Sequence, residues 1–417
     1  MTATRARAGE KPSFRGAGSR CFLSFSLLCC VACSGAELEF ADWTIPVAEG
    51  AAVFEYAPVP LDARADRVIE TEYDLVLGAD LSVPQQVFYR VSGVVPDSEG
   101  NIWVSDQGNR HVKVFDPSGA HVRTIGQEGQ GPGEFQRLFY SAIAGGHFLA
   151  MADTRRLSLW TLDGEHVRDM QLMKSLTRFA GVEEGFVARH STTVEESETA
   201  ADEQPRENYT YSLFDLDAHE LRTYAEVVQP PTWDTVALGD GDFFSIVGGG
   251  IIPSWTMRFA VAPNGVFYLT TSDEYQLHAY GSQTWSLRVA WPRADVTRQH
   301  RAIVMNTYRD ALYGATESSL PWTDQFRAIT NVEVDGHGHV YVFPFFPPLD
   351  APREDGQEAP EIDRPVDIYS ADGEHLFSGM ISISSWTGAL GDHIYLSRDN
   401  PDTDEVEVVR VRLVEPF

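Results

Sequence analysis

Residues 96–125 read PDSEGNIWVSDQGNRHVKVFDPSGAHVRTI, and this stretch decides the fold. Three short runs within it, IWVSD, VKVFD and HVRTI, are rich in β-branched and aromatic residues, which favour strands. The segments between the runs contain glycine, which tight turns between strands use readily. The stretch therefore predicts one small antiparallel sheet whose strands are joined by short connections.

The same order of runs and turns returns along the chain. Further copies begin at Ala144, Glu183, Ala262 and Asp335, and a shorter copy covers residues 390–414. One such unit cannot bury its faces alone, whereas radial packing of several units buries them. We therefore predict an all-β fold, a six-bladed β-propeller. A seven-bladed ring, with one more blade within residues 226–254, is the alternative.

The last copy lacks an outer strand. Residues 71–78, TEYDLVLG, form a strand-like run that belongs to no unit, and we expect them to pair with the last blade and close the ring. An independent N-terminal arm is the alternative. The predicted ring then covers residues 71–417 and follows a tether and arm at residues 33–70.

The first copy also carries a family resemblance. Residues 100–135, GNIWVSDQGNRHVKVFDPSGAHVRTIGQEGQGPGEF, resemble an NHL repeat and the six-bladed bacterial propellers related to it, while later copies match in pattern more than in residues. The resemblance implies a propeller that binds a ligand, in a family whose members have unrelated functions. Virginiamycin-type lyases, calcium-dependent lactonases and peptidyl-amidating lyases share the architecture. A metal-dependent lyase or lactonase-like hydrolase with a site at the channel mouth is therefore the alternative function.

The N-terminal residues resemble a bacterial lipoprotein signal. Residues 1–20 hold five basic side chains and one acid, and residues 21–32 hold no charge. This apolar run is shorter than the roughly 20 residues that a membrane-spanning helix needs. The run CVACSG then predicts removal of residues 1–32 and lipidation of Cys33, and Ser34 favours the outer membrane, facing the periplasm or the cell surface. Ordinary signal-peptidase cleavage after Ala36 is the alternative.

The composition argues against nucleic-acid binding and against cysteine chemistry in the ring. The chain has 32 Lys and Arg against 61 Asp and Glu, a net charge of -29. We therefore expect no nucleic-acid partner, because such binding depends on cationic contacts to phosphates. All four cysteines lie within residues 21–33, so the predicted ring has no thiol for disulfides or catalysis.

The long insertions fall in one set of loops. Turns after the first and third strands of each unit are short, whereas the other connections include residues 191–208, 227–254, 294–327 and 344–363. Insertions on one face of a repeat array usually mark its binding surface. We therefore predict that a protein, peptide or glycan binds this loop-rich face. The candidate contacts are Trp255, Trp322 and Phe345, each of which has anchoring its own loop as an alternative role.

One insertion has a helical pattern. Residues 295–314 have Asp295 or Thr297 as a candidate N-cap, an apolar stripe, and Gly314 as a stop signal. We expect this helix to cap the ring.

Few residues indicate chemistry, and no catalytic set is predicted. Asp106 and Asp153 each follow the second strand of a unit near the channel mouth, where they either contact a ligand or cap the strand end. Arg110 and His190, near the same face, are further candidate ligand contacts. Residues 399–405, DNPDTDE, alternate oxygen ligands as a calcium loop does but lack its glycine. Calcium thus has weak support, and we expect no other cofactor or metal.

Overall fold

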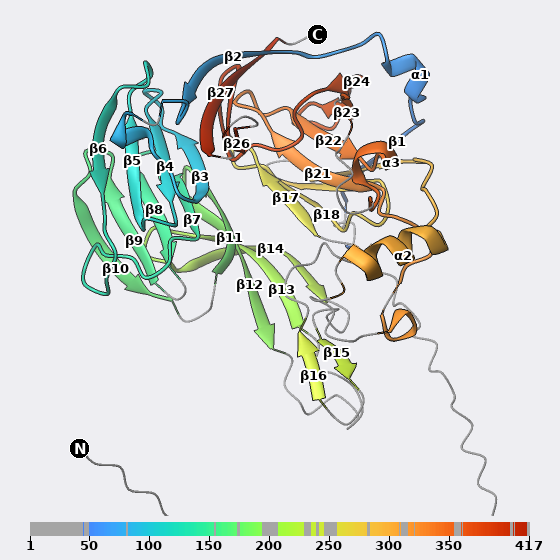
Figure 1. Ribbon diagram of the computed structural model, residues 1–417, viewed down its shortest axis with the longest axis horizontal. Coiled ribbons are helices and arrows are strands. Elements are labelled where there is room, and N and C mark those ends of the chain that lie inside the picture. Colours follow the sequence, from blue (N-terminus) through green and yellow to red (C-terminus); the bar gives the residue numbers. More distant parts are fainter. Residues whose placement is uncertain are drawn as a thin grey trace, which may run out of the picture. The chain divides into compact units, whose positions relative to one another are not determined.

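Six four-stranded antiparallel units make up the fold, and the chain fills most of them in sequence order (Figure 1). The first three blades are β3 (Val91–Pro96), β4 (Ile102–Asp106), β5 (His111–Phe115), β6 (His121–Ile125); β7 (Tyr140–Ala144), β8 (Phe148–Asp153), β9 (Arg156–Thr161), β10 (His166–Gln171); and β11 (Leu176–Val182), β12 (Gly185–Thr193), β13 (Glu207–Phe214), β14 (Glu220–Val228). The fourth and fifth blades are β17 (Arg258–Val261), β18 (Phe267–Thr270), β19 (Gln276–Tyr280), β20 (Trp285–Val289); and β21 (Ile329–Val334), β22 (Val340–Pro344), β23 (Arg364–Tyr369), β24 (His375–Ile381). The sixth has β25 (Gly388–Leu390), β26 (His393–Asp399) and β27 (Val406–Val414), completed by β2 (Glu70–Leu77).

This computed structural model describes only part of the chain. The described residues are 45, 50–80, 82–153, 156–172, 176–193, 207–228, 235–238, 242–245, 257–281, 284–307, 309, 316–320, 322–353, 360, 362–400, 403 and 405–414. They belong to one unit, Ala41–Phe417. In this part of the chain no helix is long and apolar enough to cross a membrane.

Apolar clusters lie between each blade and the next. Trp103 of the first blade packs with Leu149 and Met151 of the second, for example. The cluster that closes the ring joins Tyr395 and Val408 of the sixth blade to the first blade. Because every blade is covered on both faces, its inner strands are apolar on both sides, and all five residues of β4 are buried.

The prediction of six blades is confirmed, and the seven-bladed alternative is wrong. Where the extra blade would lie, the described residues form one hairpin, β15 (Thr235–Leu238) and β16 (Asp242–Ser245). A single hairpin has too little apolar surface to replace a four-stranded blade in the ring.

The sixth blade receives its outer strand from the N-terminal part of the chain. β2 pairs antiparallel with β27, from Glu70 opposite Val414 to Leu77 opposite Val408. This is the pairing that the sequence predicts for residues 71–78. The observed strand begins and ends one residue earlier. Figure 1 shows the two strands, blue and red, side by side.

Residues before the predicted start of the ring at residue 71 also pair with the blades. β1 (Ala52–Tyr56) adds to the fourth blade as a fifth strand, parallel to β20. α1 (Leu61–Arg64) then contacts β24 of the fifth blade, and Val68 forms a bridge with Met380. We call residues 52–77 the strap, because they run along the outer edges of three successive blades.

The short turns share one construction. Asp97, Asp116 and Asp335 each accept hydrogen bonds from the backbone N–H groups two and four residues later. Gly100 and Gly119 follow three residues after their aspartates with φ of 82° and 87°, a conformation that favours glycine. These self-capped turns leave little room for variation on this face.

At the opposite, loop-rich face the described connections contain four short helical segments. These are η1 (Pro84–Gln86), α2 (Arg298–Thr307), η2 (Glu317–Ser319) and α3 (Pro347–Asp350). α2 is the helix predicted within residues 295–314, and Thr297 caps it: its Oγ1 accepts from the backbone N–H of His300, whose Nδ1 accepts from the backbone N–H of Thr297. Val304 is the buried residue of α2, while residues 308 and 310–314 of the predicted helix lie outside the described part.

Candidate functional site

A channel of about 990 Å³ runs through the centre of the ring. Residues of β3, β7, β11, β17 and β21 line it, together with the segment 384–389 that leads into β25. Every blade therefore contributes its innermost strand to the wall. Four aromatic residues, Tyr140, Phe179, Phe259 and Trp386, belong to this lining.

Arginines gather at the loop-rich end of the channel. The first strand of each blade starts at that face, and Arg178 and Arg258 lie near the starts of β11 and β17. Arg364, the first residue of β23, also lines the channel, and third strands start at the same face. Three cations on three successive blades contrast with the net charge of -29 of the whole chain.

These arginines differ in how their charge is compensated. Arg364 is buried and forms an ion pair with Asp350 of α3, with 2.6 Å between Nη2 and Oδ1. Arg258 donates from Nε to the backbone oxygen of Thr330 at 3.0 Å. Within the described ranges, neither Arg178 nor Arg258 forms an ion pair with a carboxylate.

Burial and neighbouring cations both act on Arg258. Desolvation lowers its pKa to about 10, and repulsion from Arg178, Arg327 and Arg189 adds to this shift. The guanidinium remains protonated at neutral pH. The shift shows that several positive charges lie close to one another at this end of the channel.

Arg178 sits on a distorted stretch of β11. The pairing of β11 with β12 shifts register between Thr177 and Phe179, which is a β-bulge. The extra residue, Arg178, has a φ of 66°, which is costly for a residue with a Cβ atom. The bulge thus places one exposed guanidinium on the channel wall at an energetic cost.

Glu333 is an acid of the channel lining that interacts with both Arg178 and Arg258. Its Oε1 accepts hydrogen bonds from Asn331 Nδ2 at 2.7 Å and from Ser385 Oγ at 3.3 Å. Burial raises its pKa to about 7, although these hydrogen bonds and the charge of Arg178 act in the opposite direction. At pH 7 the carboxyl group is therefore only partly ionised, and it offsets only part of the positive charge.

Glu333 should make stability fall as the pH rises. Its folded pKa of about 7 exceeds the ordinary value of 4.5, so its stabilising contribution is complete below pH 4.5 and is lost as the pH rises through 7. Glu333→Gln changes the free energy of unfolding by a different amount at each pH. We expect this change to be about 2 kcal/mol more stabilising at pH 8 than at pH 5. Urea unfolding at both values checks this. Glu99→Gln, in an exposed turn, is the control, and equal pH profiles for the two variants would contradict the expectation.

Asp106 and Arg110 lie at the loop-rich end of the first blade, away from the channel lining. The buried Asp106 carboxylate accepts from the backbone N–H groups of Tyr89, Arg90 and Asn109 and from Asn109 Nδ2. These hydrogen bonds cap the strand end, which is the alternative role of Asp106, and its contact with a ligand stays a prediction. Arg110 donates to the backbone oxygen of Gln136 and pairs with Glu128 at 2.5 Å.

Two of the three predicted aromatic contacts belong to one cluster. Phe345 is 5% exposed and stacks on Phe326, with 4.6 Å between ring centroids, next to Val296. Trp322 is half-buried against this cluster, donates from Nε1 to Glu317 and lies under the guanidinium of Arg301. This packing is that of loop anchors, and ligand binding by Trp322 and Phe345 stays a prediction.

The remaining candidates lie in the core of a blade or outside the described residues. His190 is 1% exposed, and its Nε2 lies 3.3 Å from Ser212 Oγ within the third blade. Cys33 and Trp255 lie outside the described residues, and so does the side chain of Asp153. The structure therefore does not test the predicted roles of these three residues.

Two groups of side chains are candidates for holding a metal ion. Asp402 and Asp404 of the weak calcium loop lie outside the described residues, while Asn400 Nδ2 donates to Glu407 at 2.6 Å. On the short-turn face, Asp215, Asp217 and His219 could each offer a ligand atom to one ion. Exposed acidic groups of this kind are common, so we assign no metal to them.

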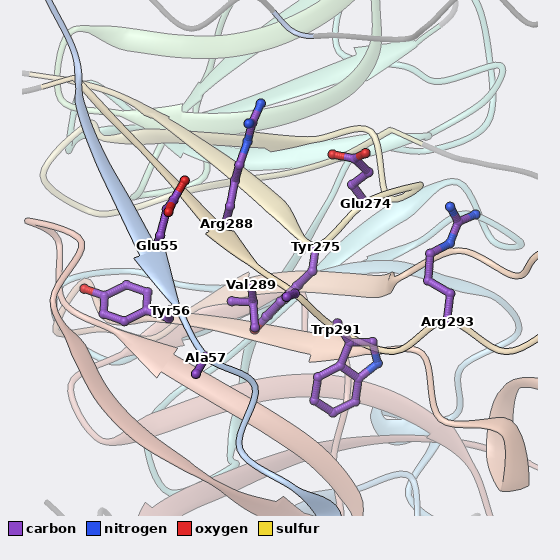
Figure 2. Close-up of a pocket in the computed structure, with 10 residues that line it drawn as sticks. Glu55, Tyr56, Ala57, Glu274, Tyr275, Arg288, Val289, Trp291 and Arg293 are labelled. Carbon is purple, nitrogen blue, oxygen red and sulfur yellow. The ribbon is translucent and has the colours of Figure 1, made fainter.

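A second hollow, of about 620 Å³, lies beside β1 (Figure 2). Its charged lining residues are Glu55, Glu274, Arg288 and Arg293, and Figure 2 shows them around Tyr275 and Trp291. Because both signs of charge alternate around it, this hollow selects neither anions nor cations. The channel has the more distinctive lining.

A comparison with protein families finds a match around the first blade. The family model DUF5128, described as a 6-bladed beta-propeller, matches residues 89–147. There the chain is similar to a six-bladed propeller family. The matched residues contain the first blade and the first strand of the second, and no curated protein matches the sequence.

Solved structures with a similar fold are distant in sequence. A Bacteroides fragilis protein described as exported is 13% identical, with a TM-score of 0.47, over 87% of this chain and 100% of that one. A member of the DUF4221 family from Bacteroides vulgatus is 13% identical, with a TM-score of 0.49, over 83% and 98%. Virginiamycin B lyase from Staphylococcus aureus is 7% identical, with a TM-score of 0.38, over 83% and 100%. Such likeness carries no argument about function.

Sequence reasoning missed Arg178, Arg258 and Glu333. A signal for the first two exists, since the tripeptide RFA occurs at 178–180 and again at 258–260. Each copy lies in the innermost strand of its blade, so the repeated tripeptide marks both arginines in the sequence. Glu333 carries no comparable signal, because its pKa depends on burial by residues from other blades.

Proposed function

We propose that the chain is an exported, lipid-anchored propeller of the NHL type that binds a protein, peptide or glycan through its loop-rich face. One observation carries this proposal: the described strands on either side of each long insertion end and begin at the face where the arginine-lined end of the channel opens. The opposite face consists of short self-capped turns. A surface that varies in this way on a fixed scaffold is typical of a binding site.

The proposed anchor rests on the N-terminal sequence. Residues 1–32 have the charge and apolar pattern of a secretory signal, and Cys33 follows the small residues of a lipoprotein-type cleavage site. A lipid on Cys33 would hold the ring at a membrane surface, and Ser34 favours the outer membrane. Mass spectrometry of the mature protein from cell envelopes tests this point, since an unmodified chain that begins at Glu37 would refute the anchor.

Binding through the loop-rich face is tested by matched substitutions on the two faces. The mature protein is immobilised, and capture of envelope components is measured for wild type, Trp322→Ala and Glu99→Ala. We expect Trp322→Ala to weaken capture about tenfold, the effect of removing a half-buried aromatic anchor. Glu99→Ala, on the short-turn face, should leave capture unchanged.

The melting temperature of each variant separates binding from folding. If Trp322→Ala leaves capture intact and Glu99→Ala abolishes it, both with unchanged melting temperatures, the wrong face has been assigned.

A further inference from the structure

We propose that Arg178 and Arg258 together bind an anionic oxygen group, a carboxylate or a phosphate, of a ligand that enters the channel from the loop-rich face. This inference rests on the proposed function and narrows it to a class of ligand. It concerns the channel itself, whereas the aromatic anchors lie in the insertions around it.

The two arginines are placed by the repeat. Each is the first residue of an RFA tripeptide in the innermost strand of its blade, and the blades are neighbours in the ring. Both line the channel, and the phenylalanine that follows each arginine also lines it. The two residues thus line the same channel, and the charge of Arg178 contributes to the lowered pKa of Arg258.

Among the described residues, the acids beside this positive charge offset only part of it. Arg364 has Asp350 as its partner, so that pair is neutral. Glu333 is partly protonated at neutral pH, because burial raises its pKa to about 7. Nearby cations in a partly desolvated channel are unfavourable unless an anion joins them, and low-dielectric walls strengthen their attraction for that anion.

The strained backbone favours a binding role over a packing role for Arg178. Its side chain is exposed and its φ of 66° is costly, yet within the described residues it forms no ion pair that would repay this cost. Strain of this kind concentrates at ligand sites. Guanidinium groups match carboxylate and phosphate oxygens in geometry, while the half-buried Phe179 and Phe259 give the body of a ligand an apolar wall.

Three small probes test this proposal on the mature protein. Calorimetric titration at low ionic strength compares glucuronate, which carries a carboxylate, with inorganic phosphate and with uncharged glucose. We expect at least one anion to bind at least about tenfold more tightly than glucose, and the preferred anion identifies the group. The variants are Arg178→Gly, Arg258→Gln and, as a control of equal charge change on the outer edge, Arg412→Gln.

Arg178→Gly is the informative variant, because glycine accepts the observed backbone conformation. It should weaken anion binding about tenfold or more while the melting temperature stays the same or rises. Arg258→Gln should weaken binding similarly, and Arg412→Gln should not. The proposal is overturned if neither anion exceeds glucose, if both channel variants bind as wild type does, or if Arg412→Gln is equally weakened. Trp322-dependent capture that persists in such a case would leave the proposed function standing.

Discussion

Arg64→Ala is expected to lower the free energy of unfolding by about 3–5 kcal/mol. The Arg64 side chain is fully buried, and its Nη2 lies 2.7 Å from Oδ1 of Asp367 on β23. It also donates to the backbone oxygens of Val59 and Val366, each at 2.9 Å. Removing the guanidinium leaves the Asp367 carboxylate buried without its counter-ion. Chemical unfolding in urea measures the loss.

The same carboxylate also joins two blades. Tyr275, from the fourth blade, donates its hydroxyl to Asp367 at 2.7 Å, and Ser378 of β24 donates to the other oxygen. Arg64 therefore completes a network that ties the strap to the fourth and fifth blades. Asp367→Asn added to Arg64→Ala should recover part of the loss, because the asparagine keeps an acceptor and carries no charge.

A matched control separates burial from charge. Arg412 of β27 pairs with Glu72 of β2 at 3.0 Å, which also joins ring and strap, but these side chains are 48% and 58% exposed. Arg412→Ala should cost less than about 1 kcal/mol. If Arg64→Ala costs no more than this control, the buried pair does not hold the strap.

Local sequence was sufficient for the blades. Residues 102–106 and 121–125 are strands in the structure at the predicted places. Short apolar runs between Asp-x-x-Gly turns pair as neighbouring antiparallel strands. The shortage of one strand in the last repeat predicted the role of residues 71–78. Such features repeat, and repetition makes them visible in a single sequence.

The strap and the channel site depend on contacts between distant parts of the chain. Arg64 forms an ion pair with Asp367, and β1 pairs in parallel with β20. Neither segment belongs to a repeat, so the sequence does not predict its contacts. The side of the strand that Arg178 occupies depends on a β-bulge, which shifts the alternation used to assign faces. Phe345 shows the converse, since an aromatic residue in a loop insertion is buried as an anchor.

Deleting residues 1–78 is expected to abolish the cooperative unfolding transition of the ring, whereas deleting residues 1–40 should leave it nearly unchanged. The first deletion removes the whole strap and exposes the pairing edge of β27, which spans Val406–Val414. It also removes Ile69 and Leu77 from the clusters on the two sides of the sixth blade. The second deletion removes none of the described residues and leaves the whole strap in place. Thermal unfolding and size-exclusion chromatography compare the two truncated proteins.

Single substitutions in the full mature chain test the same closure without the risk that the truncated protein is never obtained. Leu77 is 1% exposed, so Leu77→Ala should cost about 2–5 kcal/mol through lost burial and the cavity that remains. Val122, on the outer strand β6 of the first blade, is 46% exposed, and Val122→Ala should change stability by about 0.5 kcal/mol or less. Closure by β2 predicts this difference because only one of these outer-strand side chains lies between two blades. Equal, small losses for the two variants would mean that the ring stays closed without β2, through the contact of Tyr395 and Val408 with the first blade.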